Sequence, residues 1–290
     1  MKSIRLIGVP EHFNYPFRLL AKEQPFRSLG IEIQWKEESR GSGQMIQDLL
    51  SNQADLAILL TESFLNANES HANLKMIGFH VASPLIWGIH IAGKLEVDLP
   101  QDLPTPHFLV SRMGSGSHLM AQVLLSQIGN EWKTSPSFEI VGNLDGALEA
   151  MENGNKGMFL WEKFTTSPVV KSGQMKRIGE LPSPWPCFVM AVNTDSNSFQ
   201  EHEILAIRDW IYQMNKTLKS YSNLPQILAD EYQLGLEEVT EWLKTTRWAT
   251  EADFSKSALE ETFAQITELG ITKRKLNAKE VILNNCFRLV

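Results

Sequence analysis

A strand, a turn and a helix follow one another in Phe108-Leu-Val-Ser-Arg-Met-Gly-Ser-Gly-Ser-His-Leu-Met-Ala121. The first residues are β-prone, Gly114 and Gly116 permit positive φ, and Ser115 or Ser117 can cap the helix that follows. Backbone N–H groups and the positive end of a helix dipole attract an anionic or acceptor-rich ligand. An ordinary turn, with Gly and Ser present for steric reasons, is the alternative interpretation of this stretch alone.

The same order of strand, turn and helix recurs on both sides of this stretch. Before it, strands are predicted at 2–9, 31–36 and 55–60, each followed by a turn and apolar residues at helical spacing. After it, a strand at 137–141, a helix at 144–151 and a strand at 157–160 continue the series. Such alternation is typical of α/β layers with mainly parallel strands.

Two segments interrupt the alternation and predict crossings between two lobes. Residues 74–93 are almost unbroken strand, and two further strands are predicted at 174–181 and 187–192. We expect two Rossmann-like lobes with a cleft between them, lobe 1 from 1–90 plus 192–290 and lobe 2 from 94–188. The hinge is predicted near 87–93 and 189–194.

The C-terminal third is predicted to be helical. Ile204, Leu205, Ile207, Trp210, Ile211 and Met214 mark one apolar face of a long helix, with Trp210 expected in the core. Shorter helices are predicted at 225–232, 236–244 and 256–269, and we expect them to pack on lobe 1.

Composition limits the classes of function. The 290 residues are 43% hydrophobic and 21% charged, which is ordinary for a globular protein, and no apolar run reaches the ~20 residues of a membrane helix. The formal net charge of −7 offers no basic surface for a phosphate backbone, so nucleic acid is not an expected partner. A small molecule is the expected partner.

The first residues and the cysteines bear on the compartment. Met1 to Gly8 enters a strand pattern without an apolar signal segment, which favours a cytoplasmic protein unless a signal has been removed. Cys187 and Cys286 are far apart and form no Cys-x-x-Cys motif, so we expect buried thiols and no disulfide framework, zinc cluster or redox dithiol.

Open α/β sheets bind ligands beyond the carboxyl ends of their strands, where these turns lie. The predicted ligand-binding residues are therefore His12, Phe13, Arg40, Gly41, Ser42, Gly43, Thr61 and Glu62 in lobe 1, and Gly114, Ser115, Gly116, Ser117, His118, Asn143, Asp145, Trp161 and Glu162 in lobe 2, with Arg112 beside them. The most unusual segments contain Trp161 and Trp185. Trp161 is expected to stack on the ligand, while Trp185 either packs the lobe junction or stacks on the ligand.

No standard catalytic pattern occurs in these turns. The chain has no dinucleotide fingerprint, no phosphate-binding Gly-Lys-Ser/Thr loop, no Gly-x-Ser-x-Gly elbow and no His-Glu-x-x-His. His12 and His118 are each a hydrogen-bond donor or a general base, and the donor role is favoured because no nucleophile or Asp partner is suitably spaced. We expect no catalytic residue, no metal site and no cofactor.

The motifs in chain order resemble a type II periplasmic-binding-protein fold, and more narrowly the sulfonate, nitrate and taurine substrate-binding group. The resemblance rests on Gly8-Val-Pro-Glu-His-Phe-Asn14, Arg40-Gly-Ser-Gly-Gln-Met45, Leu59-Leu-Thr-Glu62, Ser111-Arg-Met-Gly-Ser-Gly-Ser-His118, Trp161-Glu-Lys-Phe-Thr-Thr166 and Pro184-Trp-Pro-Cys187. The tryptophan motifs are specific, whereas the glycine turns are generic. The motifs are similar to those of a bacterial and fungal branch without an export signal.

This resemblance implies a solute-binding protein of the ABC-transporter type, with lobes that close on the ligand by a hinge. The expected ligand is a small organic anion or heteroaromatic, such as a sulfonate or a pyrimidine, and a transporter permease is an expected partner if the protein is exported. The same fold hosts menaquinone-pathway enzymes and thiamine-pyrimidine synthases, so a cytosolic enzyme is the alternative. A transcription-regulator effector domain is the third functional hypothesis, and it ranks last because no DNA-binding helices precede Met1.

Overall fold

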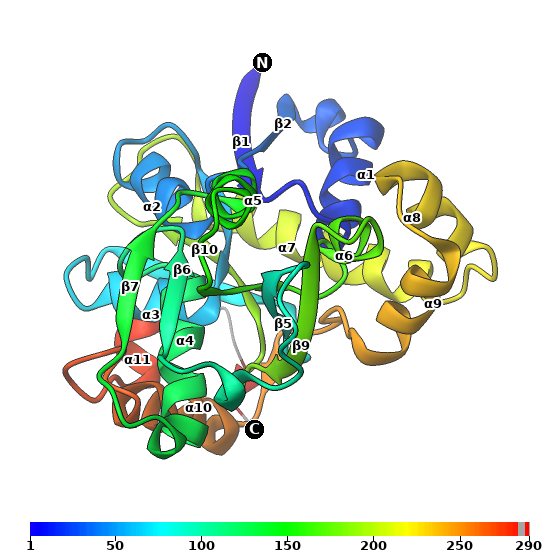
Figure 1. The fold of residues 1–290 in the computed structure, drawn as a ribbon. Helices are drawn as coiled ribbons and strands as arrows, with labels where there is room; N and C mark the ends of the chain where they lie inside the picture. Colours follow the sequence, from blue (N-terminus) through cyan, green and yellow to red (C-terminus); the bar gives the residue numbers. More distant parts are fainter. Residues whose placement is uncertain (284–287, 290) are drawn as a thin grey trace. The chain divides into compact units, whose positions relative to one another are not determined.

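The chain forms two compact units in a computed structural model that describes residues 1–283 and 288–289. Unit 1 comprises Met1–Ser83 and Trp185–Val290, and unit 2 comprises Pro84–Pro184. Each unit is built on its own five-stranded sheet (Figure 1). The expected buried thiol of Cys286 lies outside the described residues.

The sheet of unit 1 has the strand order β2-β1-β3-β10-β4. Its strands are β1 (Lys2–Gly8), β2 (Ile31–Glu37), β3 (Leu56–Leu60), β4 (Leu74–Val81) and β10 (Phe188–Asn193). β1 pairs in parallel with β2 and β3, whereas β10 is antiparallel to both β3 and β4. The central strand β3 reads LAILL because both of its faces are covered, so the sequence shows a continuous apolar run.

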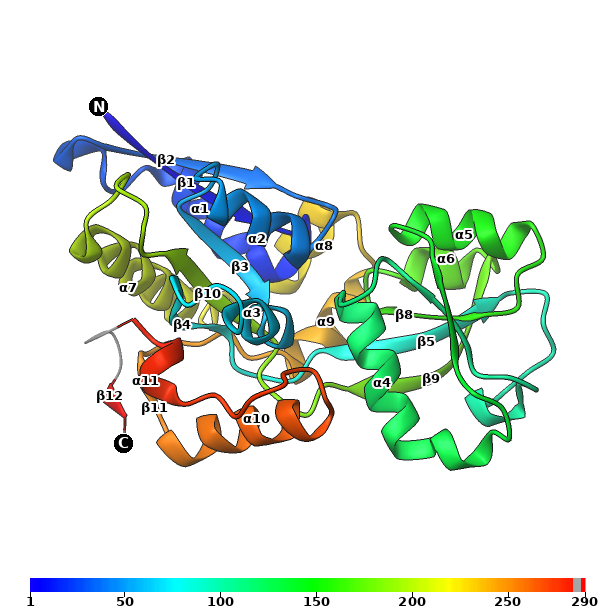
Figure 2. The same ribbon diagram turned by 90° about the vertical axis from the view of Figure 1, so that its left-hand side faces the viewer.

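Helices cover both faces of this sheet, with α1 against α7 and α2 against α3 (Figure 2). The helices of unit 1 are α1 (Tyr15–Glu23), α2 (Ser42–Leu50), α3 (Thr61–Asn68), α7 (Glu201–Leu218), α8 (Leu224–Tyr232), α9 (Leu236–Thr245), α10 (Lys256–Glu268) and α11 (Ala278–Val281). Two 3₁₀ turns, η1 (His12–Asn14) and η2 (Arg27–Leu29), and a small sheet of β11 (Asp253–Phe254) and β12 (Arg288–Leu289) complete it.

The buried face of α7 differs from the predicted apolar face. Ile204, Ile207 and Ile211 are buried, but Trp210 is only partly buried, so its predicted place in the core is wrong. Polar side chains occupy the rest of the buried stripe because they bind backbone carbonyls. The Tyr212 hydroxyl donates to the carbonyl of Phe79 (3.1 Å), and the Asn215 amide donates to that of Ala249 (2.7 Å).

The sheet of unit 2 repeats this topology in the order β7-β6-β8-β5-β9. Its strands are β5 (Ile86–Ala92), β6 (His107–Val110), β7 (Ser137–Ile140), β8 (Met158–Glu162) and β9 (Met175–Pro182). Its helices are α4 (Gly116–Ile128), α5 (Leu144–Glu152) and α6 (Ser167–Lys171), with 3₁₀ turns η3 (Pro100–Asp102) and η4 (Gly129–Glu131). One core cluster contains Ala92, Leu109, Ala147, Met151, Phe159 and Met175.

The unit boundaries lie earlier in the chain than the predicted crossings at 87–93 and 189–194. β5 pairs with β8 and β9 and so belongs to unit 2, and β10 pairs with β3 and β4 and so belongs to unit 1. The breaks fall at Pro84 and Pro184. Pro84 lies between the end of β4 at Val81 and the start of β5 at Ile86, and Pro184 lies between the end of β9 and the start of β10.

Each sheet has one point where the direction of strand succession reverses. From β1 the chain moves outward to β2 and then returns across β1 to β3, so the carboxyl ends of β1 and β3 flank this switch point. In unit 2 the carboxyl ends of β6 and β8 flank the corresponding point. Open α/β sheets bind their ligands at such points.

No helix within 1–283 and 288–289 is long and apolar enough to span a bilayer.

Candidate functional site

Glu62 stands at the switch point of unit 1, directly after β3. Its side chain lies in the first turn of α3 and is 1% exposed. Its Oε2 atom accepts a hydrogen bond from Trp185 Nε1 (2.7 Å), but its Oε1 atom has no hydrogen-bond partner among the described residues. Burial raises the pKa of Glu62 to about 7, against the lowering effect of its own backbone N–H and of Trp185. This carboxyl therefore has capacity left to bind a hydrogen-bonding group.

The segment Trp185–Cys187 fixes Glu62 in place. Trp185 is 1% exposed and uses its indole N–H on the carboxylate, so it is a buried positioning residue. The Thr61 hydroxyl donates to the carbonyl of Pro186, and the Thr61 N–H donates to that of Cys187 (3.0 Å). The side chain of Cys187 is buried, as the sequence predicted. Thr61 thus supports the site through its backbone partners.

His12 and Phe13 follow β1 and form the other side of this switch point. The carbonyl of Phe13 accepts hydrogen bonds from His80 Nε2 (2.7 Å) and Trp248 Nε1 (2.8 Å). The Phe13 ring lies 5.1 Å from that of Phe188, and Phe188 pairs with Leu60 at the end of β3. The predicted residues after β1 and β3 are therefore joined through one packed layer of unit 1.

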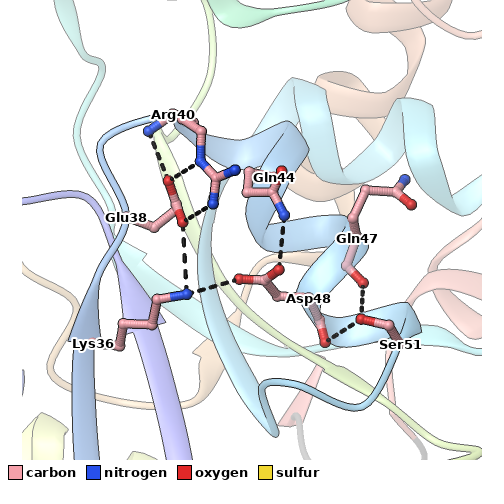
Figure 3. Close-up of polar contacts among 7 residues, drawn as sticks. All are labelled: Lys36, Glu38, Arg40, Gln44, Gln47, Asp48 and Ser51. Atoms are coloured by element: carbon pink, nitrogen blue, oxygen red, sulfur yellow. Dashed lines mark hydrogen bonds and ion pairs between the residues drawn. The ribbon is translucent and has the colours of Figure 1, made fainter.

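The Arg40 turn is occupied by an ion-pair network (Figure 3). The Arg40 guanidinium binds Glu38 through Nε (2.7 Å) and Nη2 (2.7 Å), and Lys36 lies near both Glu38 and Asp48. The Arg40 side chain lowers the pKa of Glu38 to about 2. Because Arg40 is bound to Glu38 in this way, the turn offers no uncompensated positive charge for a ligand anion.

The remaining residues of this turn hold the backbone. Gly41 has φ +77°, a conformation that favours glycine. The Ser42 hydroxyl accepts a hydrogen bond from the N–H of Leu60 (3.0 Å), and so links the start of α2 to the end of β3. Gly43 lies within α2. Ligand contacts by Arg40 to Gly43 stay a prediction.

We expect Glu38→Gln to destabilise the protein at pH 7. The folded-state pKa of Glu38 is depressed, so the ionised carboxylate contributes stability above its ordinary pKa of 4.5, and this contribution is lost as the pH falls toward 2. Urea unfolding at pH 7 and pH 3 measures the effect. A deficit in the variant that is as large at pH 3 as at pH 7 would contradict the role of the ion pair.

In the Gly/Ser turn of unit 2, at residues 111–118, polar side chains form hydrogen bonds with backbone N–H groups of the same turn. Gly114 has φ +77°, and its N–H donates to His118 Nδ1 (3.1 Å), which makes Nδ1 an acceptor. The Ser115 hydroxyl caps α4 by accepting from the N–H of His118 (3.4 Å), and the Ser117 hydroxyl accepts from the N–H of Ser111 (3.0 Å). The predicted hydroxyl contacts to a ligand therefore compete with bonds inside the turn.

Two backbone donors remain at the start of α4. Gly116 and Ser117 are the first residues of this 13-residue helix, and no acceptor for their N–H groups is found in the part of the chain that the structure describes. Half-buried Arg112 lies in the same turn, where burial lowers its pKa. These groups favour an acceptor-rich or anionic partner.

The other predicted residues of unit 2 have structural contacts. The Asn143 side chain caps α5 by accepting from the N–H of Gly146 (3.0 Å), and Asp145 is exposed in the first turn. Trp161 is partly buried and stacks on Phe159, with ring centroids 5.1 Å apart and 16° between planes. Its ring thus packs on the core cluster of unit 2, and ligand stacking by Trp161 stays a prediction.

Glu162 differs from Glu62 although both are buried. Its Oε2 atom accepts from the N–H groups of Phe164 (2.9 Å) and Thr165 (2.6 Å) and from the Thr165 hydroxyl (2.8 Å). Burial raises the pKa of Glu162 to about 7. Because this oxygen already has three donors, Glu62 is the better candidate to bind a donor of the ligand.

Two further residues near His12, Tyr232 and Trp242, were not predicted from the sequence. Their rings lie 6.1 Å and 4.2 Å from the His12 ring. They belong to α8 and α9. The helical spacing of apolar residues in these segments predicts only that the aromatic side chains pack against the core, and it gives no indication of a binding role. Within the described ranges, no group of three or more His, Cys, Asp or Glu side chains is arranged to hold a metal ion.

Two α/β units, each with a switch point and one antiparallel strand inserted next to its edge strand, define the type II periplasmic-binding-protein fold, which confirms the predicted fold class. The family model described as Ca3427-like PBP matches residues 87–181, which all lie in unit 2. No curated protein sequence matches the chain.

Solved structures extend the similarity over the whole chain. The Candida albicans CA3427 gene product, described as having the generic periplasmic binding protein fold, is 22% identical with a TM-score of 0.86, covering 100% of this chain and 99% of that one. The zinc-bound ligand-binding component of an ABC-type import system from Staphylococcus aureus is 12% identical (TM-score 0.76, 99% and 98% covered). The alkanesulfonate-binding protein SsuA from Xanthomonas axonopodis pv. citri, bound to MOPS, is 16% identical (TM-score 0.73, 97% and 98% covered). The predicted resemblance to sulfonate-binding proteins is thus confirmed at the level of the fold.

Proposed function

We propose that the protein binds a small solute, and that this solute is a heteroaromatic compound with an amino group. The observation that carries the proposal is the buried Glu62 carboxyl, which has one oxygen without a partner in the described part of the chain and lies at a switch point. A buried polar atom of this kind is costly unless a ligand or water satisfies it. An amino group on a planar ring supplies the donor that Oε1 lacks.

A small organic anion is the competing ligand class. It is supported by the N–H groups of Gly116 and Ser117 and by the fold shared with the SsuA protein named above. In unit 1 the charges argue against it, because Arg40 is bound to Glu38 and Glu62 is itself acidic. We therefore favour the heteroaromatic solute over a sulfonate.

We expect cytosine or 4-aminopyrimidine to raise the thermal stability of the protein more than taurine, methanesulfonate or methylphosphonate at equal concentration. A ligand at ~100 times its dissociation constant stabilises the folded state by about 2.7 kcal/mol. Differential scanning fluorimetry with the five compounds measures this, and titration calorimetry confirms each hit.

The Glu62→Gln variant is the matched test of the site. Glutamine keeps the shape and an acceptor for Trp185 but replaces an acceptor oxygen with a donor, so the aminopyrimidine response should weaken. Stabilisation by sulfonates alone, equal in wild type and Glu62→Gln, would overturn the proposal.

A cytosolic enzyme on the same fold is the second candidate. It is favoured by the Glu62 carboxyl, since a pKa of about 7 suits a general acid or base at neutral pH. Mass spectrometry of each stabilising compound after incubation with the protein detects turnover.

We propose delivery of the solute to a transporter permease only for an exported protein. Cell fractionation tests whether the protein is exported.

A further inference from the structure

Among the buried side-chain atoms of unit 1 that have no hydrogen-bond partner in the described residues, three belong to neighbouring aromatic rings. They are Nε2 of His12, the hydroxyl oxygen of Tyr232 and Nε1 of Trp242. The whole side chains of His12 and Trp242 are 2% and 1% exposed. One such atom is an ordinary defect of packing, but three together point to a missing hydrogen-bonding guest.

The geometry of the cluster places His12 between the other two rings. Its centroid lies 4.2 Å from that of Trp242 and 6.1 Å from that of Tyr232, both in edge arrangements. His12 comes from η1 after β1, Tyr232 ends α8, and Trp242 lies in α9. Three segments that are separate in the sequence thus bring these rings together after β1.

All three groups are uncharged at neutral pH. Burial lowers the pKa of His12 to about 3, and burial raises the pKa of Tyr232 above its ordinary value. The Arg18 guanidinium lies 4.4 Å from the Tyr232 ring centroid, but it forms ion pairs with Glu37 and Glu231. The cluster therefore suits an uncharged group: Trp242 donates, Tyr232 donates or accepts, and the neutral His12 ring nitrogen does either.

We infer that His12, Tyr232 and Trp242 form a neutral hydrogen-bonding subsite that binds the ring nitrogen and carbonyl oxygen of a planar heteroaromatic solute. This inference rests on the function proposed above and extends it to helices α8 and α9. The subsite lies in the same unit as Glu62, to which it is linked through Phe13, Phe188 and Leu60. Cytosine is a suitable probe because it carries an amino group, a ring nitrogen acceptor and a carbonyl oxygen.

Tyr232→Phe tests the subsite by removing one hydroxyl. We expect the affinity for cytosine, measured by titration calorimetry, to fall roughly threefold to tenfold, as for the loss of one hydrogen bond. The melting temperature without ligand should stay unchanged or rise, because the removed hydroxyl has no partner in the described residues. Trp242→Phe provides a second variant, with the same fall in affinity expected.

The matched control is Tyr212→Phe, also in unit 1. Its hydroxyl donates to the carbonyl of Phe79, so we expect a lower melting temperature and an unchanged affinity. If wild type binds cytosine and both subsite variants bind it equally well, the three atoms hold only water or nothing, and the subsite is overturned while the function stands. If neither cytosine nor 4-aminopyrimidine binds wild type, the proposed function and the subsite both fail.

Discussion

Glu62→Gln is expected to change the pH dependence of stability by about 3 kcal/mol between pH 4 and pH 8. The pKa of Glu62 is raised from 4.5 in the unfolded chain to about 7 in the folded protein. The unfolded state therefore loses its proton first, and folding becomes less favourable as the pH rises from 4.5 to 7. Each unit of pKa difference corresponds to about 1.4 kcal/mol. Glutamine does not titrate, so the variant gains stability relative to wild type as the pH rises.

Urea unfolding of both proteins at pH 4, 6 and 8 measures this difference directly. Comparing the two proteins at each pH cancels the contribution of Glu162, whose pKa is also raised. Glu38→Gln is the control of opposite sign, since the pKa of Glu38 is lowered and its carboxylate stabilises the fold at high pH. Parallel stability curves for wild type and Glu62→Gln would show that the Glu62 carboxyl is not desolvated.

The elements around both switch points were predictable because their signals are local. The apolar run of β3, the glycine at φ +77° before α2 and the Gly/Ser turn before α4 each act through the backbone at their own position. Local signals of strand, turn and helix then give the order of elements, and right-handed crossovers restrict the possible topologies. The two α/β lobes therefore followed from these local signals, whereas the type II periplasmic-binding-protein class was predicted from the resemblance of the motifs.

Partners that are distant in sequence could not be predicted in this way. Glu62 and Trp185 are 123 residues apart, and only the folded sheet brings the indole N–H to the carboxylate. Tyr232 and Trp242 lie at positions of α8 and α9 that the apolar spacing assigns to packing, so the sequence pattern does not indicate a role for their polar atoms. The roles of these residues depend on tertiary contacts rather than on any motif.

Some competition from neighbouring residues is visible in the sequence itself. Arg40 is two residues from Glu38, and the short turn between them places the guanidinium on the carboxylate. Glu162 is three residues from Thr165, so its carboxylate reaches back to the N–H groups of its own turn. In both cases a nearby residue of the chain binds a group that was predicted to bind a ligand, and the ligand contact stays a prediction.

Phe159→Ala is expected to lower the free energy of unfolding by about 3 to 5 kcal/mol, the usual cost of truncating a buried aromatic residue. Phe159 is 0% exposed and belongs to the core cluster of unit 2, where it stacks on Trp161. Chemical denaturation gives the change in stability. Because hydrogen exchange resolves individual strands, it should show the greatest loss of protection in β8 and its neighbours.

Trp161→Ala separates packing from ligand binding on the same ring stack. Trp161 is partly exposed, so we expect a smaller loss of stability than for Phe159→Ala, together with weaker cytosine binding if its free face contacts the solute. The loss of an aromatic contact is of order 0.5 to 1.5 kcal/mol beyond buried area. A variant that binds cytosine as wild type does, yet is as destabilised as Phe159→Ala, would make Trp161 a core residue and remove it from the candidate site. The ligand-contacting surface of unit 2 would then be restricted to the start of α4, where Gly116 and Ser117 present their N–H groups.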